Sequence, residues 1–115
     1  MIKRNEQLSR EVLQNRFGGK GEVSIVKLIE GEQFQGKGRL FAHNTLKPGC
    51  SIGRHQHNGD VEAYYILKGE GTVDDNGVMT TVRAGDVVFT GNGEFHGIEN
   101  TGRENLEMIA LVLFA

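Results

Sequence analysis

The stretch GCSIGRHQHNGDVEAYYILKG, residues 49–69, decides the fold of this chain. Its two histidines, His55 and His57, stand one residue apart, and Glu62 follows five positions after His57. Alternate residues of a β-strand point to the same side, so both imidazoles can face one direction. We therefore predict a strand that ends near His57, a turn over residues 58–60, and a second strand that returns Glu62 to the histidines.

A third histidine, His96, lies 34 positions after Glu62, within GDVVFTGNGEFHGIEN, residues 85–100. If the sheet curls back on itself, this histidine reaches the same place as His55 and His57. Three imidazoles and one carboxylate are ligands that suit a divalent transition metal. The sequence therefore predicts one metal ion at these four residues, with two open positions if the ion is octahedral.

Short apolar runs separated by glycine-containing turns fill the rest of the chain. This spacing is typical of an all-β antiparallel sandwich or barrel. Asn76-Gly77 is the clearest hairpin turn, because these residues tolerate the positive φ angles that a tight turn requires. The predicted strands cover residues 22–30, 39–46, 54–57, 61–67, 71–74, 79–83, 86–90, 94–100 and 106–114.

One helix is expected, near the N-terminus, over residues 5–17. Leu8, Val12, Leu13 and Phe17 fall roughly on one helical face, and a glycine follows them. We expect residues 1–21 to form a short helical segment that packs as a lid. Residues 22–115 should then form the β-barrel domain.

Length and charge narrow the classes of function. A chain of 115 residues fits one domain, and 13 basic against 15 acidic side chains give a net charge of -2. Nucleic acid and anionic membranes are therefore poor partners. We expect a cytoplasmic protein, since no signal peptide or membrane-spanning stretch is apparent and the single cysteine, Cys50, cannot form an internal disulfide.

The two blocks together resemble the two sequence motifs of the cupin superfamily, in its small single-domain form. The resemblance implies a double-stranded β-helix, or jelly-roll barrel, in which His55, His57, Glu62 and His96 bind a metal. It departs at Gly91, where the second motif usually has proline, so this loop is less restricted. The matching positions are Gly49-x5-His55-x-His57-x4-Glu62-x6-Gly69 and Gly85-x7-Gly93-x2-His96-x3-Asn100.

Strand alternation nominates further residues of the pocket. Tyr64 shares a face with Glu62. It either exchanges a hydrogen bond with a ligand, which makes it the one catalytic candidate, or is a core tyrosine with its hydroxyl at the barrel mouth. Ile98 shares a face with His96. Asn100 either orients the His96 ring or is simply a turn residue at the strand end. Asn44 should point inward, whereas its neighbour His43 should not.

The last strand is apolar on both faces. Met108 and Ala110 share the face expected to point toward the core and pocket, and Ile109 and Leu111 share the other. Burial of both faces predicts a packed neighbour outside the barrel, and the resemblance points to a homodimer.

Few cationic side chains are in phase with the predicted ligands. Phosphorylated sugars and dicarboxylates, which need cationic groups, are therefore less favoured unless Arg39 or Arg83 turns inward. The pocket is expected to be mostly apolar around its metal.

The leading hypothesis is a metalloenzyme that acts on a small organic molecule as a dioxygenase, decarboxylase or isomerase. The alternative is a non-catalytic module that senses a small ligand or a metal, and a third possibility is a barrel with a vestigial site. Fe, Mn, Ni, Zn and Cu all remain open as the metal. Binding to neutral imidazoles should weaken as pH falls through about 6.5.

Overall fold

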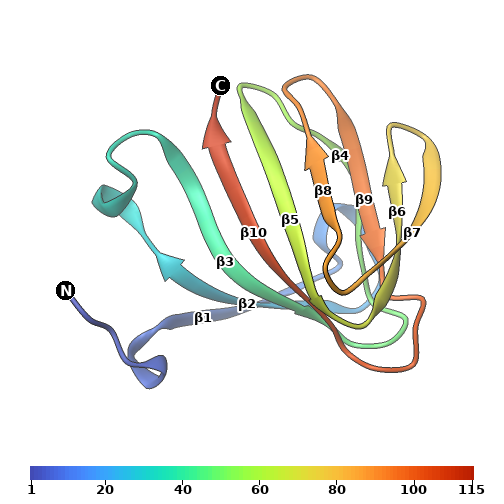
Figure 1. Cartoon of the computed structure of the whole chain (residues 1–115), viewed down its shortest axis with the longest axis horizontal. Coiled ribbons are helices and arrows are strands. Elements are labelled where there is room, and N and C mark those ends of the chain that lie inside the picture. Colours follow the sequence, from blue (N-terminus) through green and yellow to red (C-terminus); the bar gives the residue numbers. More distant parts are fainter.

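The computed structural model describes the whole chain, residues 1–115, as two antiparallel sheets packed face to face (Figure 1). Six strands form one sheet in the order β1-β2-β3-β10-β5-β8, and four form the other in the order β4-β9-β6-β7. The predicted all-β jelly-roll barrel is confirmed. The strands are β1 (Ser9–Gln14), β2 (Glu22–Ile29), β3 (Gly38–Leu46), β4 (Ser51–Gln56), β5 (Asp60–Lys68), β6 (Glu70–Asp75), β7 (Val78–Arg83), β8 (Val87–Thr90), β9 (Phe95–Glu99) and β10 (Leu106–Phe114).

Three short 3-10 helices complete the elements, namely η1 (Asn5–Gln7), η2 (Arg16–Gly18) and η3 (Gly31–Phe34). None of them has the length or the hydrophobicity needed to cross a lipid bilayer.

The core lies between the sheets and consists of inward-facing aliphatic side chains. Ala42, Leu46, Ile66 and Leu106 are fully buried. The Asn76-Gly77 turn joins β6 to β7 with φ angles of 50° and 92°, as the hairpin prediction requires. Alternation and turn chemistry therefore account for the barrel.

The N-terminal helix is the main error of the sequence prediction. Residues 9–14 form strand β1, which pairs antiparallel with β2 from Ser9 opposite Lys27 to Gln14 opposite Glu22. Val12 and Phe17 remain about half exposed, so the residues of the predicted stripe do not share one buried face. Pairing along the open edge of β2 gives the backbone its hydrogen bonds instead.

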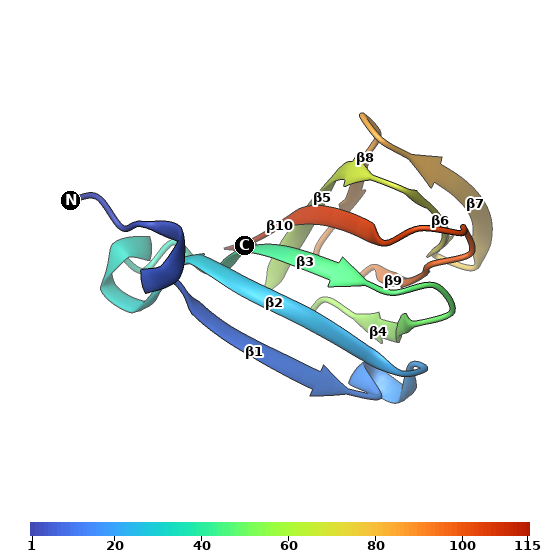
Figure 2. The same cartoon turned by 90° about the horizontal axis from the view of Figure 1, so that it is seen from below.

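β1 lies at the outer edge of the six-stranded sheet, and η2 follows it beside β4 (Figure 2). The backbones meet closely there, since a Cβ added to Gly53 would lie 2.0 Å from the Phe17 carbonyl oxygen. A Cβ added to Gly19 would lie 2.2 Å from the carbonyl oxygen of Ser51. Only glycine allows this approach, which holds the η2 turn against the strand that carries His55.

Candidate metal centre

Four side chains from three strand regions meet inside the barrel. His55 lies on β4, His57 directly follows that strand, Glu62 lies on β5 and His96 on β9. Their possible ligand atoms all lie within 4.8 Å of one another. His55 and His96 are register partners across β4 and β9, so sheet pairing sets their approach. The residues predicted to converge do so.

The donor atoms approach one another closely. Nε2 of His57, Nε2 of His96 and Oε1 of Glu62 form a triangle with sides of 3.0, 3.1 and 3.1 Å. Nε2 of His55 lies 3.0 Å from Nε2 of His96. An ion bound at about 2.1 Å puts neighbouring octahedral ligands about 3.0 Å apart, so the four residues fit the predicted divalent ion.

Partners on the far side of each ring orient the Nε2 atoms. Nδ1 of His55 lies 2.8 Å from the Gly53 carbonyl oxygen, which can only accept, so Nδ1 carries the proton and donates. Nδ1 of His57 lies 2.7 Å from Oδ1 of Asp60, and Nδ1 of His96 lies 2.7 Å from the Thr90 hydroxyl. Because Gly53 and Asp60 accept from Nδ1, the Nε2 lone pairs of neutral His55 and His57 face the cluster, where they can bind a cation.

The ionisable groups show how the cluster behaves without a metal. Burial raises the pKa of Glu62, but hydrogen bonds from His57 and His96 outweigh it and lower this pKa to about 2. The pKa of His57 is raised, first by its hydrogen bond with Glu62 and then, against the effect of burial, by that with Asp60. Burial lowers the pKa of His55. A proton on His57 therefore takes the cation's place in the metal-free protein.

Tyr64 forms the floor of the cluster. Its ring stacks on that of His96, with centroids 5.2 Å apart and planes 12° apart. The side chain is buried, and burial together with the nearby Glu62 charge raises its pKa well above the usual value. Tyr64 therefore keeps its proton and can donate a hydrogen bond to a ligand.

The other nominated residues divide into two groups. Asn44 lies inside the barrel and lines the pocket, while His43 is outside, 2.9 Å from Glu107. Ile98, Met108 and Ala110 are buried in the core and do not line the pocket.

Asn100 is buried but does not contact a ligand ring. Its amide donates to the carbonyl oxygens of Leu46 and Glu104 and accepts from the Gly102 N–H. The alternative of a turn residue at the strand end therefore describes it. Thr90 and Asp60 orient the rings instead.

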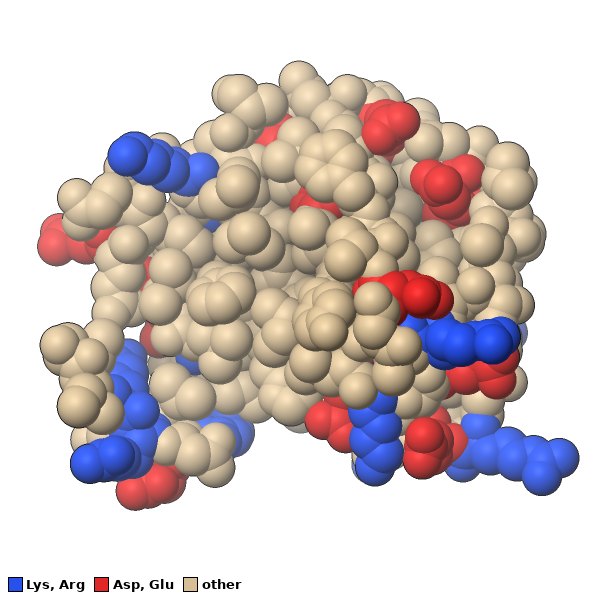
Figure 3. Space-filling model, viewed as in Figure 1, with Lys and Arg blue, Asp and Glu red and all other residues tan.

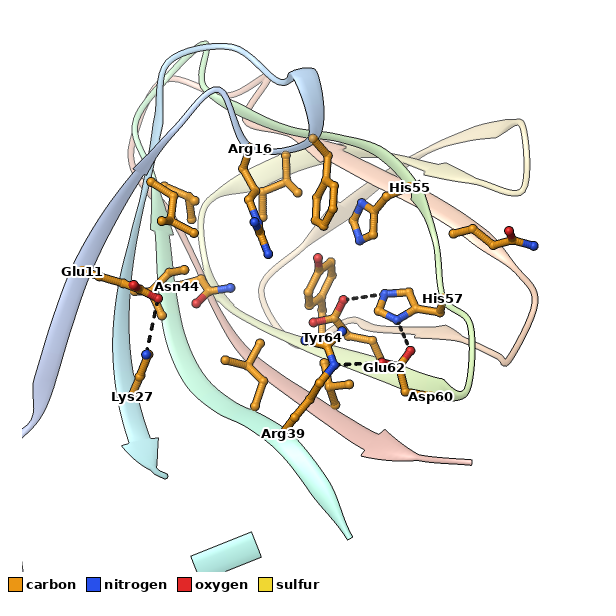
Figure 4. Close-up of a pocket in the computed structure, with 18 of the residues that line it drawn as sticks. Glu11, Arg16, Lys27, Arg39, Asn44, His55, His57, Asp60, Glu62 and Tyr64 are labelled. Atoms are coloured by element: carbon orange, nitrogen blue, oxygen red, sulfur yellow. Dashed lines mark hydrogen bonds and ion pairs between the residues drawn. The ribbon is translucent and has the colours of Figure 1, made fainter. Parts of the chain in front are cut away.

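The cluster opens into a cavity of about 390 Å³ (Figure 4). Arg16, Lys27 and Arg39 line it, so the expectation that few cations face the pocket is wrong. Arg39 lies near the start of β3, where its long side chain reaches 2.9 Å from Asp60 although the alternation turned it outward. Arg16 comes from the segment that was predicted as a helix, and Lys27 lies on β2, which was predicted as a strand but not assigned to the pocket. Arg83 pairs with Glu70 elsewhere.

Sequence reasoning also missed Phe17. Its ring stacks on His55, with centroids 4.0 Å apart and planes 15° apart. The contact joins residues far apart in the chain, and no motif signals it. Asp60, in contrast, carried a signal, since a carboxylate three residues after a ligating histidine in a tight turn is placed to accept from its ring.

Comparisons with known proteins give a consistent result. A family model described as a cupin domain matches residues 42–113. An oxalate-binding protein of Thermotoga maritima is 47% identical over 113 residues, which cover 98% of this chain and 93% of that protein. A crystal structure of a predicted oxalate decarboxylase of Thermotoga maritima is 46% identical, with a TM-score of 0.95 and full coverage of both chains. A polyketide cyclase of Streptomyces resistomycificus, 22% identical with a TM-score of 0.78 over 99% of this chain and 80% of that one, shares the fold.

Proposed function

Because this chain belongs to the cupin family, we propose that it binds a small carboxylate, with oxalate the first candidate, at a divalent metal held by the four clustered residues. The observation that carries the proposal is the convergence of three imidazoles and one carboxylate, whose ligand atoms lie within 4.8 Å of one another, with Nε2 of His96 3.0 to 3.1 Å from each of the other three. The sequence identity of 47% to an oxalate-binding protein supports the choice of oxalate as the ligand.

The cavity walls suit an anion. Tyr64 offers a buried hydroxyl beside the cluster, and Arg39, which pairs with Asp60, lines the cavity. A bound ion would supply positive charge to attract and polarise carboxylate oxygens. The protein's part is to hold the three rings, keep Tyr64 protonated and present basic side chains to the ligand.

A calorimetric titration tests this proposal. Protein loaded with Mn²⁺, Fe²⁺, Ni²⁺, Zn²⁺ or Cu²⁺ in turn should bind oxalate, and metal-free protein should bind it at least ten-fold more weakly. His96→Ala and Glu62→Gln should abolish stoichiometric metal binding. His43→Ala is the matched control, because this histidine lies outside the cavity. A folded protein that takes up no metal would refute the proposal.

Decarboxylation is the second candidate, and the protonated Tyr64 beside the cluster favours it. The carbon–carbon bond of oxalate would break, one half leaving as carbon dioxide and the other taking a proton on carbon to become formate. Tyr64 would donate that proton and recover it from water. Formate production lost in Tyr64→Phe, with oxalate affinity kept, would establish turnover, whereas binding without formate would leave a sensor or carrier.

A further inference from the structure

Asn44 is a buried amide without a partner. It lies on β3 between Ala42 and Leu46, which are fully buried core residues, and is itself 4% exposed. Its Oδ1 accepts no hydrogen bond. Figure 4 shows the amide pointing into the cavity from the side opposite His57. Buried polar groups are nearly always hydrogen-bonded, so the missing donor belongs to whatever enters the cavity.

Arg16 is the second group without a counterpart. Of the three basic side chains that line the cavity, Lys27 lies 3.6 Å from Glu11, and Arg39 lies 2.9 Å from Asp60. Arg16 makes no such ion pair, and its guanidinium lies over the Phe17 ring, 4.3 Å from the centroid. Figure 4 shows it pointing into the same cavity as Asn44.

The backbone around Arg16 sets where its exposed side chain leaves the chain. Asn15 and Phe17, on either side, have φ angles of 50° and 51°, which non-glycine residues rarely adopt. The close contact of Gly53 with Phe17 fixes the turn against β4. The turn therefore places the Arg16 side chain at the cavity, where it lies over the Phe17 ring without an anionic partner.

The volume of the cavity argues for a ligand longer than oxalate. Small-molecule pockets usually measure about 300 to 1,000 Å³, and at about 390 Å³ this cavity exceeds what six non-hydrogen atoms fill. Oxalate at the histidine cluster would leave the Arg16 and Asn44 side of the cavity to water.

We infer that Arg16 and Asn44 form a second subsite, which binds the tail of a hydroxylated dicarboxylate whose head lies at the histidine cluster. Arg16 takes the distal carboxylate, and Asn44 Oδ1 accepts from the hydroxyl. The inference rests on the proposed function for the head of the ligand and adds the class of molecule.

Titration of three acids into metal-loaded protein separates the contribution of Arg16 to binding from that of Asn44. Oxalate lacks a tail, succinate adds length and a distal carboxylate, and malate adds a hydroxyl. Wild type should bind malate about ten-fold more tightly than succinate. Asn44→Leu should remove that advantage, and Arg16→Gln should weaken both longer acids at least ten-fold while changing oxalate less than three-fold. A control at the paired Lys27, Lys27→Gln, should have a smaller effect than Arg16→Gln.

Several results would overturn the inference. One is a wild type that binds neither succinate nor malate. Another is a tighter binding of malate than of succinate that persists in Asn44→Leu, as it would if the malate hydroxyl contacted the metal. The third is an equal loss of affinity for all three acids in Arg16→Gln. If oxalate also fails to bind, the proposed function fails, and the subsite is tested in metal-free protein. There malate should raise the melting temperature of wild type but not of Arg16→Gln.

A ligand-free measurement separates recognition from structure. Asn44→Leu replaces an unpartnered amide with an apolar group of similar size, so it should raise the melting temperature of the ligand-free protein by a few degrees. A lower melting temperature would mean that Asn44 supports the fold, contrary to the inference.

Discussion

Nδ1 of His57 lies 2.7 Å from Oδ1 of Asp60, three residues further along the chain, and both side chains are buried. The other oxygen of Asp60 accepts from Arg39 at 2.9 Å. Both oxygens of the carboxylate are therefore engaged, and it cannot turn away from the ring. The tight turn between β4 and β5 thus fixes both the orientation and the protonated nitrogen of His57.

Asp60→Asn should weaken metal binding about 10- to 100-fold, as loss of an orienting group typically does. Competition against a chromophoric chelator measures the change. Asp86→Asn should leave the affinity unchanged, because this exposed carboxylate does not line the cavity and accepts from the Arg83 N–H in a turn. An unchanged affinity in Asp60→Asn would mean that sheet pairing alone orients the ring.

His57 should make the stability of the metal-free protein depend on pH. Its raised pKa means that the folded state holds the proton more tightly than the unfolded chain, whose histidines titrate near about 6.5. This stabilisation is complete below about pH 6.5 and is lost as pH rises through the raised value. In urea denaturation, His57→Gln should therefore lower the free energy of unfolding more at about pH 6 than at about pH 9. A cost independent of pH would contradict the assignment.

With saturating metal the pH dependence associated with His57 should reverse. The ion needs the neutral ring, so binding releases a proton and its affinity rises with pH. Calorimetry in two buffers of different ionisation enthalpy counts the protons released. We expect a positive count near neutral pH that falls in His57→Gln, whereas a count of zero in wild type would refute proton displacement.

Self-association stays a prediction, and the outer face of the six-stranded sheet is where we expect it. Val87 and Phe89 on β8 are 65% and 60% exposed, and Tyr65 lies beside them on β5. The middle of the face seen in Figure 3 is mostly uncharged. An exposed apolar area of this kind is typical of subunit contacts.

Light scattering should accordingly give the mass of a dimer. Phe89→Glu should weaken the dimer at least ten-fold, because a charge would be buried at the contact. Val78→Glu, at a similarly exposed residue on β7, is the control and should have no effect. A wild-type monomer at high concentration would refute this prediction.

Gly53→Ala should destabilise the protein by about 1 to 3 kcal/mol, since the added methyl group would overlap the Phe17 carbonyl oxygen. Gly91→Ala is a milder change, because the nearest atom there is the flexible carboxylate of Glu94. Urea denaturation compares the two. Equal losses of stability in the two variants would show that the η2 turn can move away from β4 with little change in the free energy of unfolding.

The barrel and the histidine cluster could be predicted because both follow from local rules. His55 and His57 face one way by strand alternation, and Asn76-Gly77 closes its hairpin by turn chemistry. His96 and Ile98 share one face of their strand, and both are buried. Strand ends differed by only a few residues, so the predicted barrel positions were close to those observed.

The wall opposite the cluster could not be predicted, because it depends on contacts between distant residues. The spacing of Leu8, Val12 and Leu13 fits a helix, but only Leu13 packs against the core. The segment forms a strand because its backbone pairs with β2. Arg16 therefore appeared in the wrong element. Arg39 shows a different limit, since a long side chain can reach a place that its Cβ does not face.

The close backbone contacts of Gly19 and Gly53 join two parts of the chain, of which only one lies in the region matched by the family model. On one side stand the four clustered residues, all within the region 42–113 that defines the family. On the other stands the β1-η2-β2 hairpin, which lies wholly outside that region and supplies Arg16 and Phe17. Substitutions in this hairpin therefore change the wall of the cavity while the four clustered residues stay as they are.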